Sequence, residues 1–300
     1  MIEQTQATGS PIGVVGLGNI GRGVAAALHR TGLKYLAYDV NPAAASAIEP
    51  TPRLAATPRE VASECALVGI CVFDEDQVRD VLFGADGLLA AGRDGLAVVV
   101  ISTINPDAVP DIAEKAAQQG ARVIDAGVTP GFALPSGQAV SFVGGAAEDV
   151  ERARPLLSAY SSNVLHVGPL GTGMAAKVAR NVATYCIWRA MYEAARIAET
   201  AGVGLDQLLE GIGIGDSRSA GRPGGAPGIV LDRRGTSDQA APGDPKIEWL
   251  RFLNSTMKKD LMAADQFAHR LGLDLPMLAY TSQHTAETIG LPDDLQTNRY

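Results

Sequence analysis

The sequence has few cysteines, few aromatic residues and no excess of basic charge. Three cysteines in 300 residues are too few for a disulfide framework, and we expect buried, reduced thiols in a cytoplasmic protein. No CxxC pair or His/Cys cluster predicts a metal site. The formal net charge of −8 lacks the footprint of a nucleic-acid-binding protein. No apolar run reaches the roughly 20 residues that span a bilayer. We therefore expect neither nucleic acid nor membrane as a partner.

Glycine, in contrast, is abundant, at 34 of 300 residues against a usual share of about 7%. In the first half of the chain, short apolar runs alternate with helical segments, which predicts a parallel sheet covered on both faces. The strands are expected at 12–17, 34–39, 68–73, 96–101 and 121–125, with closing strands at 139–144 and 163–167.

From about residue 168 the strand pattern stops. The run 173–202 is apolar nearly all round, which predicts a long buried helix, and further helices are expected at 204–212, 246–271 and 276–289. We predict an α/β domain over 1–167 and an all-helical domain over 168–300. The stretch 211–247 holds nine glycines and four prolines, too many for a helix interior. It is either a surface loop or a lid whose arginines help select an anionic substrate.

The hexapeptide GLGNIG follows the first predicted strand and opens a helix, as in a doubly wound Rossmann fold that binds a dinucleotide. The helix N-terminus offers free N–H groups to a pyrophosphate. Asp39 ends the next strand, where a carboxylate can accept the ribose hydroxyls of NAD and would repel a 2′-phosphate. These residues predict an NAD site, with NADP the alternative: Gly16, Leu17, Gly18, Asn19, Ile20, Gly21 and Asp39.

Lys177 and Asn181 are four residues apart on the long predicted helix and so share one face. A lysine among apolar neighbours must snorkel to solvent, pair with an acid or line a cavity. Next to a dinucleotide site, Lys177 is a candidate for the group that takes the hydroxyl proton when an alcohol loses hydride. The segment 125–131 (DAGVTPG) is expected to be a strand end and a small-residue loop, whose N–H groups and Thr129 hydroxyl can hold a carboxylate.

Together, these segments resemble the β-hydroxyacid dehydrogenase family, which includes 3-hydroxyisobutyrate dehydrogenases and tartronate semialdehyde reductases. The resemblance covers about residues 11–290. GLGNIG is similar to the family's GLGxMG signature, STINP at 102–106 to its S-T-I segment, and KDL at 259–261 to its C-terminal signature. The most specific piece is GTGMAAKVARN at 171–181, which matches the catalytic motif GxGxxxKxxxN.

The resemblance implies a Rossmann domain, a long interdomain helix and a helical domain like that of 6-phosphogluconate dehydrogenase. It implies NAD(P)-dependent interconversion of a 3-hydroxy acid, a small-molecule carboxylate, with its 3-oxo acid or semialdehyde. It also implies a homodimer or homotetramer. Carried over by motif, Lys177 is the catalytic lysine, and the further sites are substrate contacts at Thr129, Gly131, Gly173 and Asn181, and cofactor contacts at Val72, Thr103 and Lys259.

The sequence departs from the family pattern where the substrate is expected to bind. The usual DAPVSGG reads DAGVTPG, the usual Leu-Pro after the third strand reads Val72-Phe73, and the stretch 211–247 is not a family feature. Because Pro130 has no N–H to donate, we expect a substrate other than 3-hydroxyisobutyrate. Two other functions stay open: imine reduction, which the presence of a lysine at position 177 disfavours, and non-catalytic dinucleotide binding.

Overall fold

The computed structural model describes residues 10–218, 245–270 and 272–291. The chain divides into two compact units, one up to Lys177 and one from Val178 on. Within the described residues, no helix combines the length and the apolarity that crossing a bilayer requires. The division falls inside one long helix, so the two units are described separately.

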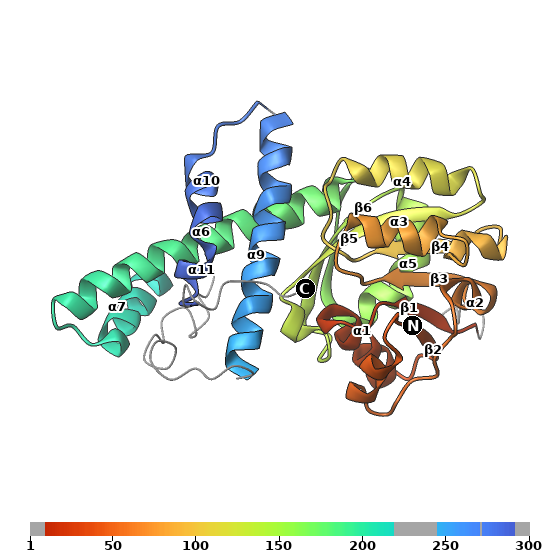
Figure 1. The fold of residues 1–300 in the computed structure, drawn as a ribbon, viewed down its shortest axis with the longest axis horizontal. Coiled ribbons are helices and arrows are strands. Elements are labelled where there is room, and N and C mark those ends of the chain that lie inside the picture. Colours follow the sequence, from red (N-terminus) through yellow and green to blue (C-terminus); the bar gives the residue numbers. More distant parts are fainter. Residues whose placement is uncertain (1–9, 219–244, 271, 292–300) are drawn as a thin grey trace. The chain divides into compact units, whose positions relative to one another are not determined.

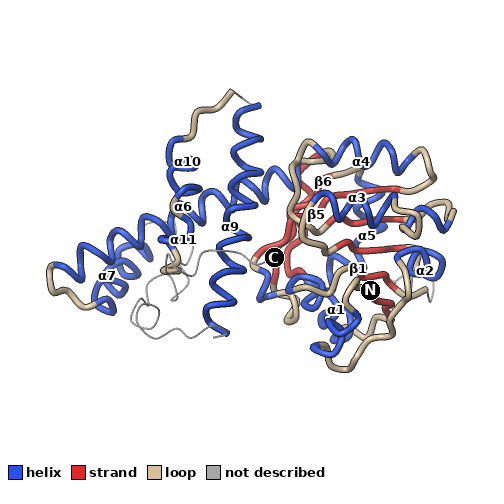
Figure 2. Tube along the Cα trace, in the orientation of Figure 1, coloured by secondary structure: helices blue, strands red, loops and turns tan. Residues whose placement is uncertain are grey.

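The first unit is built on a seven-stranded sheet with the order β2-β1-β3-β4-β5-β6-β7 (Figures 1 and 2). Neighbouring strands pair in parallel except β5 and β6, which are antiparallel. The strands are β1 (Ile12–Val15), β2 (Tyr35–Tyr38), β3 (Leu67–Ile70), β4 (Ala97–Val100), β5 (Arg122–Thr129), β6 (Ala139–Gly144) and β7 (Ser161–Gly168).

Helices cover both faces of this sheet. Alternate residues of a strand point to opposite faces, so Val14 packs into the core under α1 (Asn19–Arg30) and α5 (Ala147–Tyr160), whereas Val15 packs into the core on the other face. That second core is shared with α2 (Pro58–Glu64), α3 (Glu75–Phe83) and α4 (Ala108–Ala117). The arrangement explains why the strands read as continuous apolar runs. Short 3-10 helices complete the unit: η1 (Pro42–Ala47), η2 (Leu88–Ala91) and η3 (Gly131–Ala133).

The second unit is helical. It contains most of α6 (Thr172–Thr200), together with α7 (Leu205–Arg218), α9 (Pro245–Arg270), α10 (Pro276–Gln283) and α11 (Thr285–Thr288). Its core is formed by large side chains of α6, among them Tyr185, Trp188 and Tyr192, and by apolar residues of α9 such as Leu250 and Leu261.

The predicted fold class is confirmed: a Rossmann-type sheet is followed by helices. Some element boundaries are wrong. The expected interruption at 211–247 does not begin at 211, because α7 continues through Arg218; glycine in a helix costs about 1 kcal/mol each and does not forbid it. Residues 219–244, which hold most of the expected loop or lid, lie outside the described residues. Helices α2 and α3 are not among the predicted elements.

Candidate active site

The GLGNIG turn connects β1 to α1 as expected. Gly16 has a φ of +90°, and a Cβ there would lie 2.6 Å from the carbonyl oxygen of Cys71. A Cβ on Gly21 would overlap the carbonyl oxygen of Gly16, so glycine at 21 lets the helix pack on the turn. Gly18 differs, because it is exposed and a Cβ there would meet open space. It is also the N-cap of α1, without a side-chain cap. The turn thus fits a pyrophosphate approaching the backbone at Gly18.

Asp39 directly follows β2 and hydrogen-bonds to the backbone of the GLGNIG turn. Its Oδ2 accepts a hydrogen bond from the backbone N–H of Leu17 at 2.6 Å, and its Oδ1 accepts one from the N–H of Asn41 at 2.8 Å. Each carboxylate oxygen keeps a second lone pair for another donor. The half-buried carboxylate next to the glycine turn therefore fits a ribose diol.

Three more predicted residues lie at the same edge of the sheet. Val72 and Thr103 follow β3 and β4, and Thr129 is the last residue of β5. Because β1, β3, β4 and β5 are parallel, their carboxyl ends meet at the edge that carries the glycine turn. The Thr129 side chain is buried, and its hydroxyl has no hydrogen-bond partner among the described residues. A buried unpartnered hydroxyl at a ligand crevice is a candidate substrate contact.

The expectation that the strand ends at Asp125 and a loop follows is wrong for residues 126–129. β5 runs through Thr129 because the segment pairs with β6, with Gly127 opposite Phe142. The loop begins only at Pro130, and the N–H groups of Ala133 and Leu134 donate to the carbonyls of Pro130 and Gly131. The N–H groups of Ala133 and Leu134 are thus already used, whereas the Thr129 hydroxyl stays a candidate donor to a substrate carboxylate, as does the predicted Gly131 N–H.

Asp125 fixes the start of α6 against β5. Its carboxylate is fully buried and accepts hydrogen bonds from the backbone N–H groups of Gly171 at 2.8 Å and Met174 at 2.7 Å. Burial raises the pKa of Asp125, and these two hydrogen bonds oppose the rise. Lys177 follows within the first two turns of α6 and is half-buried. The side chain of Asp125 thus ties the lysine's helix to the sheet.

In the second unit, two predicted residues are connected through a carboxylate. The Nδ2 group of Asn181 donates to Oδ2 of Asp260 at 2.6 Å, and the hydroxyl of Tyr185 donates to the same oxygen at 3.1 Å. The ammonium group of Lys259 lies 3.4 Å from Oδ1 of Asp260. Burial and the nearby carboxylate raise the pKa of Tyr185. Asn181 and Lys259, predicted to contact substrate and cofactor respectively, thus share one buried partner.

Three residues that hydrogen-bond to the elements carrying predicted site residues were not themselves predicted: Asp125, Tyr185 and Asp260. A signal was present for two of them, because Asp260 lies inside the KDL segment and Tyr185 is one helical turn after Asn181. Asp125 was noted only as a strand end. Gly173, predicted as a substrate contact, lies close to the sheet backbone, where a Cβ would be 2.6 Å from the carbonyl oxygen of Phe142.

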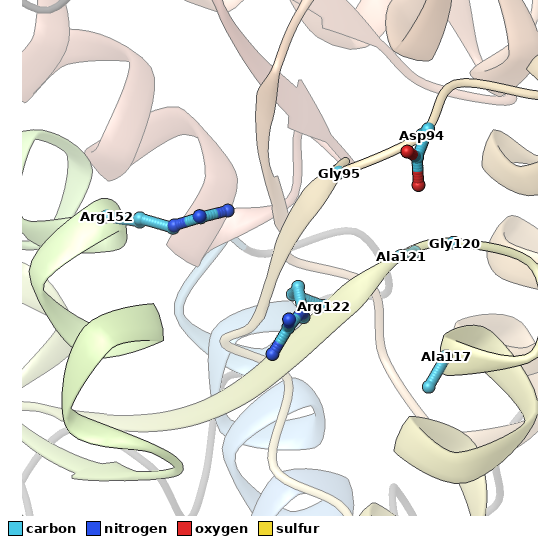
Figure 3. Close-up of a pocket in the computed structure, with 7 residues that line it drawn as sticks. All are labelled: Asp94, Gly95, Ala117, Gly120, Ala121, Arg122 and Arg152. Carbon is cyan, nitrogen blue, oxygen red and sulfur yellow. The ribbon is translucent and has the colours of Figure 1, made fainter.

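A cavity of about 460 Å³ lies in the first unit away from these residues (Figure 3). The cavity lies at the amino ends of β4 and β5, which is the sheet edge opposite the glycine turn. The guanidinium group of Arg122, which lines the cavity, is 3.7 Å from a carboxylate oxygen of Asp149. None of the predicted site residues lines it; the lining residues are Asp94, Gly95, Ala117, Gly120, Ala121, Arg122 and Arg152. The described residues hold no cluster of three His, Cys, Asp or Glu side chains suited to a metal ion.

Comparison with known proteins decides the family. Residues 11–168 match the model of the NAD binding domain of 6-phosphogluconate dehydrogenase. An uncharacterized oxidoreductase of Mycobacterium tuberculosis is 32% identical over 283 residues, 94% of each chain. The chain belongs to the β-hydroxyacid dehydrogenase family. As a member of this family, it is an oxidoreductase with an NAD(P)-binding Rossmann domain.

Other relatives of this chain are enzymes named for their substrates. The L-threonate dehydrogenase of Cupriavidus necator is 32% identical over 66% of this chain and 68% of its own length. The mouse mitochondrial 3-hydroxyisobutyrate dehydrogenase is 31% identical over 60% of this chain and 54% of its own length. The solved structure of a 3-hydroxyisobutyrate dehydrogenase from Salmonella typhimurium has a TM-score of 0.76 and 26% identity, covering 96% of this chain and 98% of that chain.

Proposed function

We propose that this chain is an NAD-dependent dehydrogenase that interconverts a 3-hydroxy acid and its 3-oxo acid or semialdehyde, with Lys177 as general acid and base. The observation that carries the proposal is the position of Lys177 at β5. The lysine is on the helix that Asp125 ties to this strand, and the strand ends at Thr129, at the sheet edge that carries the glycine turn. A proton acceptor at this edge is what the oxidation of an alcohol requires.

The proposed roles follow the chemistry of each side chain. The cofactor would supply the hydride acceptor, with its pyrophosphate held by the GLGNIG turn, its ribose diol held by Asp39, and further contacts from Val72 and Thr103 at the ends of β3 and β4. Lys177 takes the substrate's hydroxyl proton, and it returns a proton to the oxygen in the reverse reaction. The Thr129 hydroxyl and the Gly131 N–H donate to the substrate carboxylate. From the family resemblance we further propose that Asn181 contacts the substrate and that Lys259 contacts the cofactor.

Asp39 supports NAD over NADP in this proposal. Its carboxylate is already held by two backbone N–H groups, so it would present negative charge to a 2′-phosphate. We expect Asp39→Ser to weaken the binding of NAD and to raise kcat/KM with NADP relative to kcat/KM with NAD. The homodimer or homotetramer stays a prediction from the family resemblance, and the cytoplasmic location stays a prediction from the small number of cysteines.

An absorbance assay at the nicotinamide band tests the function. Purified protein is incubated with NAD or NADP and a panel of carboxylates: 3-hydroxyisobutyrate, L-threonate, L-serine and glycerate, with the corresponding esters as controls. We expect NAD-dependent turnover of at least one free acid, little turnover of its ester, and a substrate preference other than 3-hydroxyisobutyrate. No turnover of any acid, together with reduction of a cyclic imine by NADPH, would replace this proposal with imine reduction.

A further inference from the structure

Strand β5 carries no side chain at the point where it passes Lys177. Gly127 is buried in the strand, and a Cβ built on it would overlap the Cβ of Lys177 and lie 2.9 Å from the lysine's Cγ. The same Cβ would lie 3.1 Å from the carbonyl oxygen of Gly173. Non-bonded carbon atoms pack at about 3.5–4.0 Å. In this chain, the stem of Lys177 therefore occupies the space of a side chain at position 127, where the related motif DAPVSGG has proline.

The helix that carries Lys177 has little freedom to move away from the strand. Two N–H groups at its start donate to Asp125, which is fully buried. A Cβ on Gly173 would lie 2.6 Å from the carbonyl oxygen of Phe142 and 2.8 Å from the Asp125 carboxylate, so the first turn of α6 already rests on backbone. In an interior this closely packed, an added methyl group displaces the atoms around it. Because the Cβ of Lys177 moves only with its backbone, a methyl group at position 127 would shift Lys177 together with its turn of α6.

We propose that Gly127 is a positioning residue for Lys177. Its missing side chain lets the lysine stem lie directly on β5, two residues before the buried hydroxyl of Thr129, and this contact sets where the ammonium group is held. Gly127 contacts Lys177 and acts through it. The inference rests on the proposed catalytic role of Lys177, and it adds a determinant of lysine placement that lies in the sheet.

The activity test compares Gly127→Ala with a matched control, Gly13→Ala. A Cβ on Gly13, in β1 of the same sheet, would lie 2.5 Å from Val61 and 2.8 Å from Val68, so it inserts a methyl group into a similarly tight site without touching Lys177. We expect Gly127→Ala alone to lower kcat, by about ten- to a hundred-fold. KM and the Kd of NADH should change by less than about two-fold. A kcat for Gly127→Ala within about two-fold of the control would overturn the proposal.

A second comparison tests the contact without using activity. Gly127→Ala is made in the wild-type background and in a Lys177→Gly background, which removes the lysine atoms that the methyl group would meet. We expect the urea midpoint to fall in the first background and to change little in the second. An equal fall in both would overturn the proposal.

The same pair of variants covers the case in which Gly127→Ala does not fold. Folding of the double variant then supports the proposal, and its failure to fold overturns it. If the wild-type protein turns over no acid in the panel, the proposed function fails. The urea comparison still decides whether the absence of a side chain at Gly127 makes room for the stem of Lys177.

Discussion

Replacing Asp125 should destabilise the first unit more than replacing any exposed carboxylate. The Asp125→Ala variant leaves the N–H groups of Gly171 and Met174 buried without their acceptor. Each such loss costs about 1–3 kcal/mol, so we expect the free energy of unfolding to fall by about 2–6 kcal/mol. Asp125→Asn keeps one acceptor oxygen and should lose roughly half as much.

Urea denaturation followed by circular dichroism measures both variants against a control at an exposed aspartate. Asp111 is 45% exposed and pairs with Arg79 and Lys115; Asp111→Ala should therefore cost at most about 1 kcal/mol. A loss of less than about 1 kcal/mol for Asp125→Ala would refute the reasoning, because it would mean that water or a shifted helix replaces the carboxylate. Asp125→Asn should also lower kcat, since Lys177 is on the helix that the carboxylate fixes.

Two further predictions concern charge and thiol chemistry. Burial alone would raise the pKa of Glu287, but the hydrogen bond and charge of Arg189 outweigh it and hold that pKa below its ordinary value of 4.5. The pair therefore stabilises the fold above pH 4.5, and this stabilisation is lost as the pH falls through the folded pKa. Glu287→Gln should lower the free energy of unfolding at neutral pH by about 1 kcal/mol. In this variant the urea midpoint should also fall less steeply as the pH is lowered below 4.5. Burial raises the pKa of both Cys65 and Cys71 to about 12, so dithionitrobenzoate at mildly alkaline pH should label Cys186 first, as peptide mass spectrometry would show. Labelling of Cys71 at the rate of Cys186 would contradict that burial.

Much of the first unit was predictable because local signals decide it. β1, β3 and β4 are short apolar runs buried on both faces, and GLGNIG needs glycine at 16 and 21 for steric reasons that a sequence motif records. The missed helix α2 also had a local signal. The Thr57 hydroxyl accepts from the N–H of Glu60, the first half of a capping box.

The rest of the site depends on contacts between distant segments. Asn181 and Asp260 are 79 residues apart, so no local pattern indicates that one holds the other. The segment Ala126–Thr129 has no apolar run, and it is a strand because β6 pairs with it. Gly127 is another example, since only the close approach of α6 shows why a side chain is excluded there.

The measurement that tests the central claim most directly is the rate of a single turnover in Lys177→Met. Methionine keeps an unbranched stem against Gly127 and removes the ammonium group, so packing is preserved and proton transfer is lost. We expect the rate of NADH formation from the preferred hydroxy acid to fall by about two to four orders of magnitude, while the Kd of NADH stays within about two-fold of wild type. A rate close to that of the wild-type protein would contradict the account.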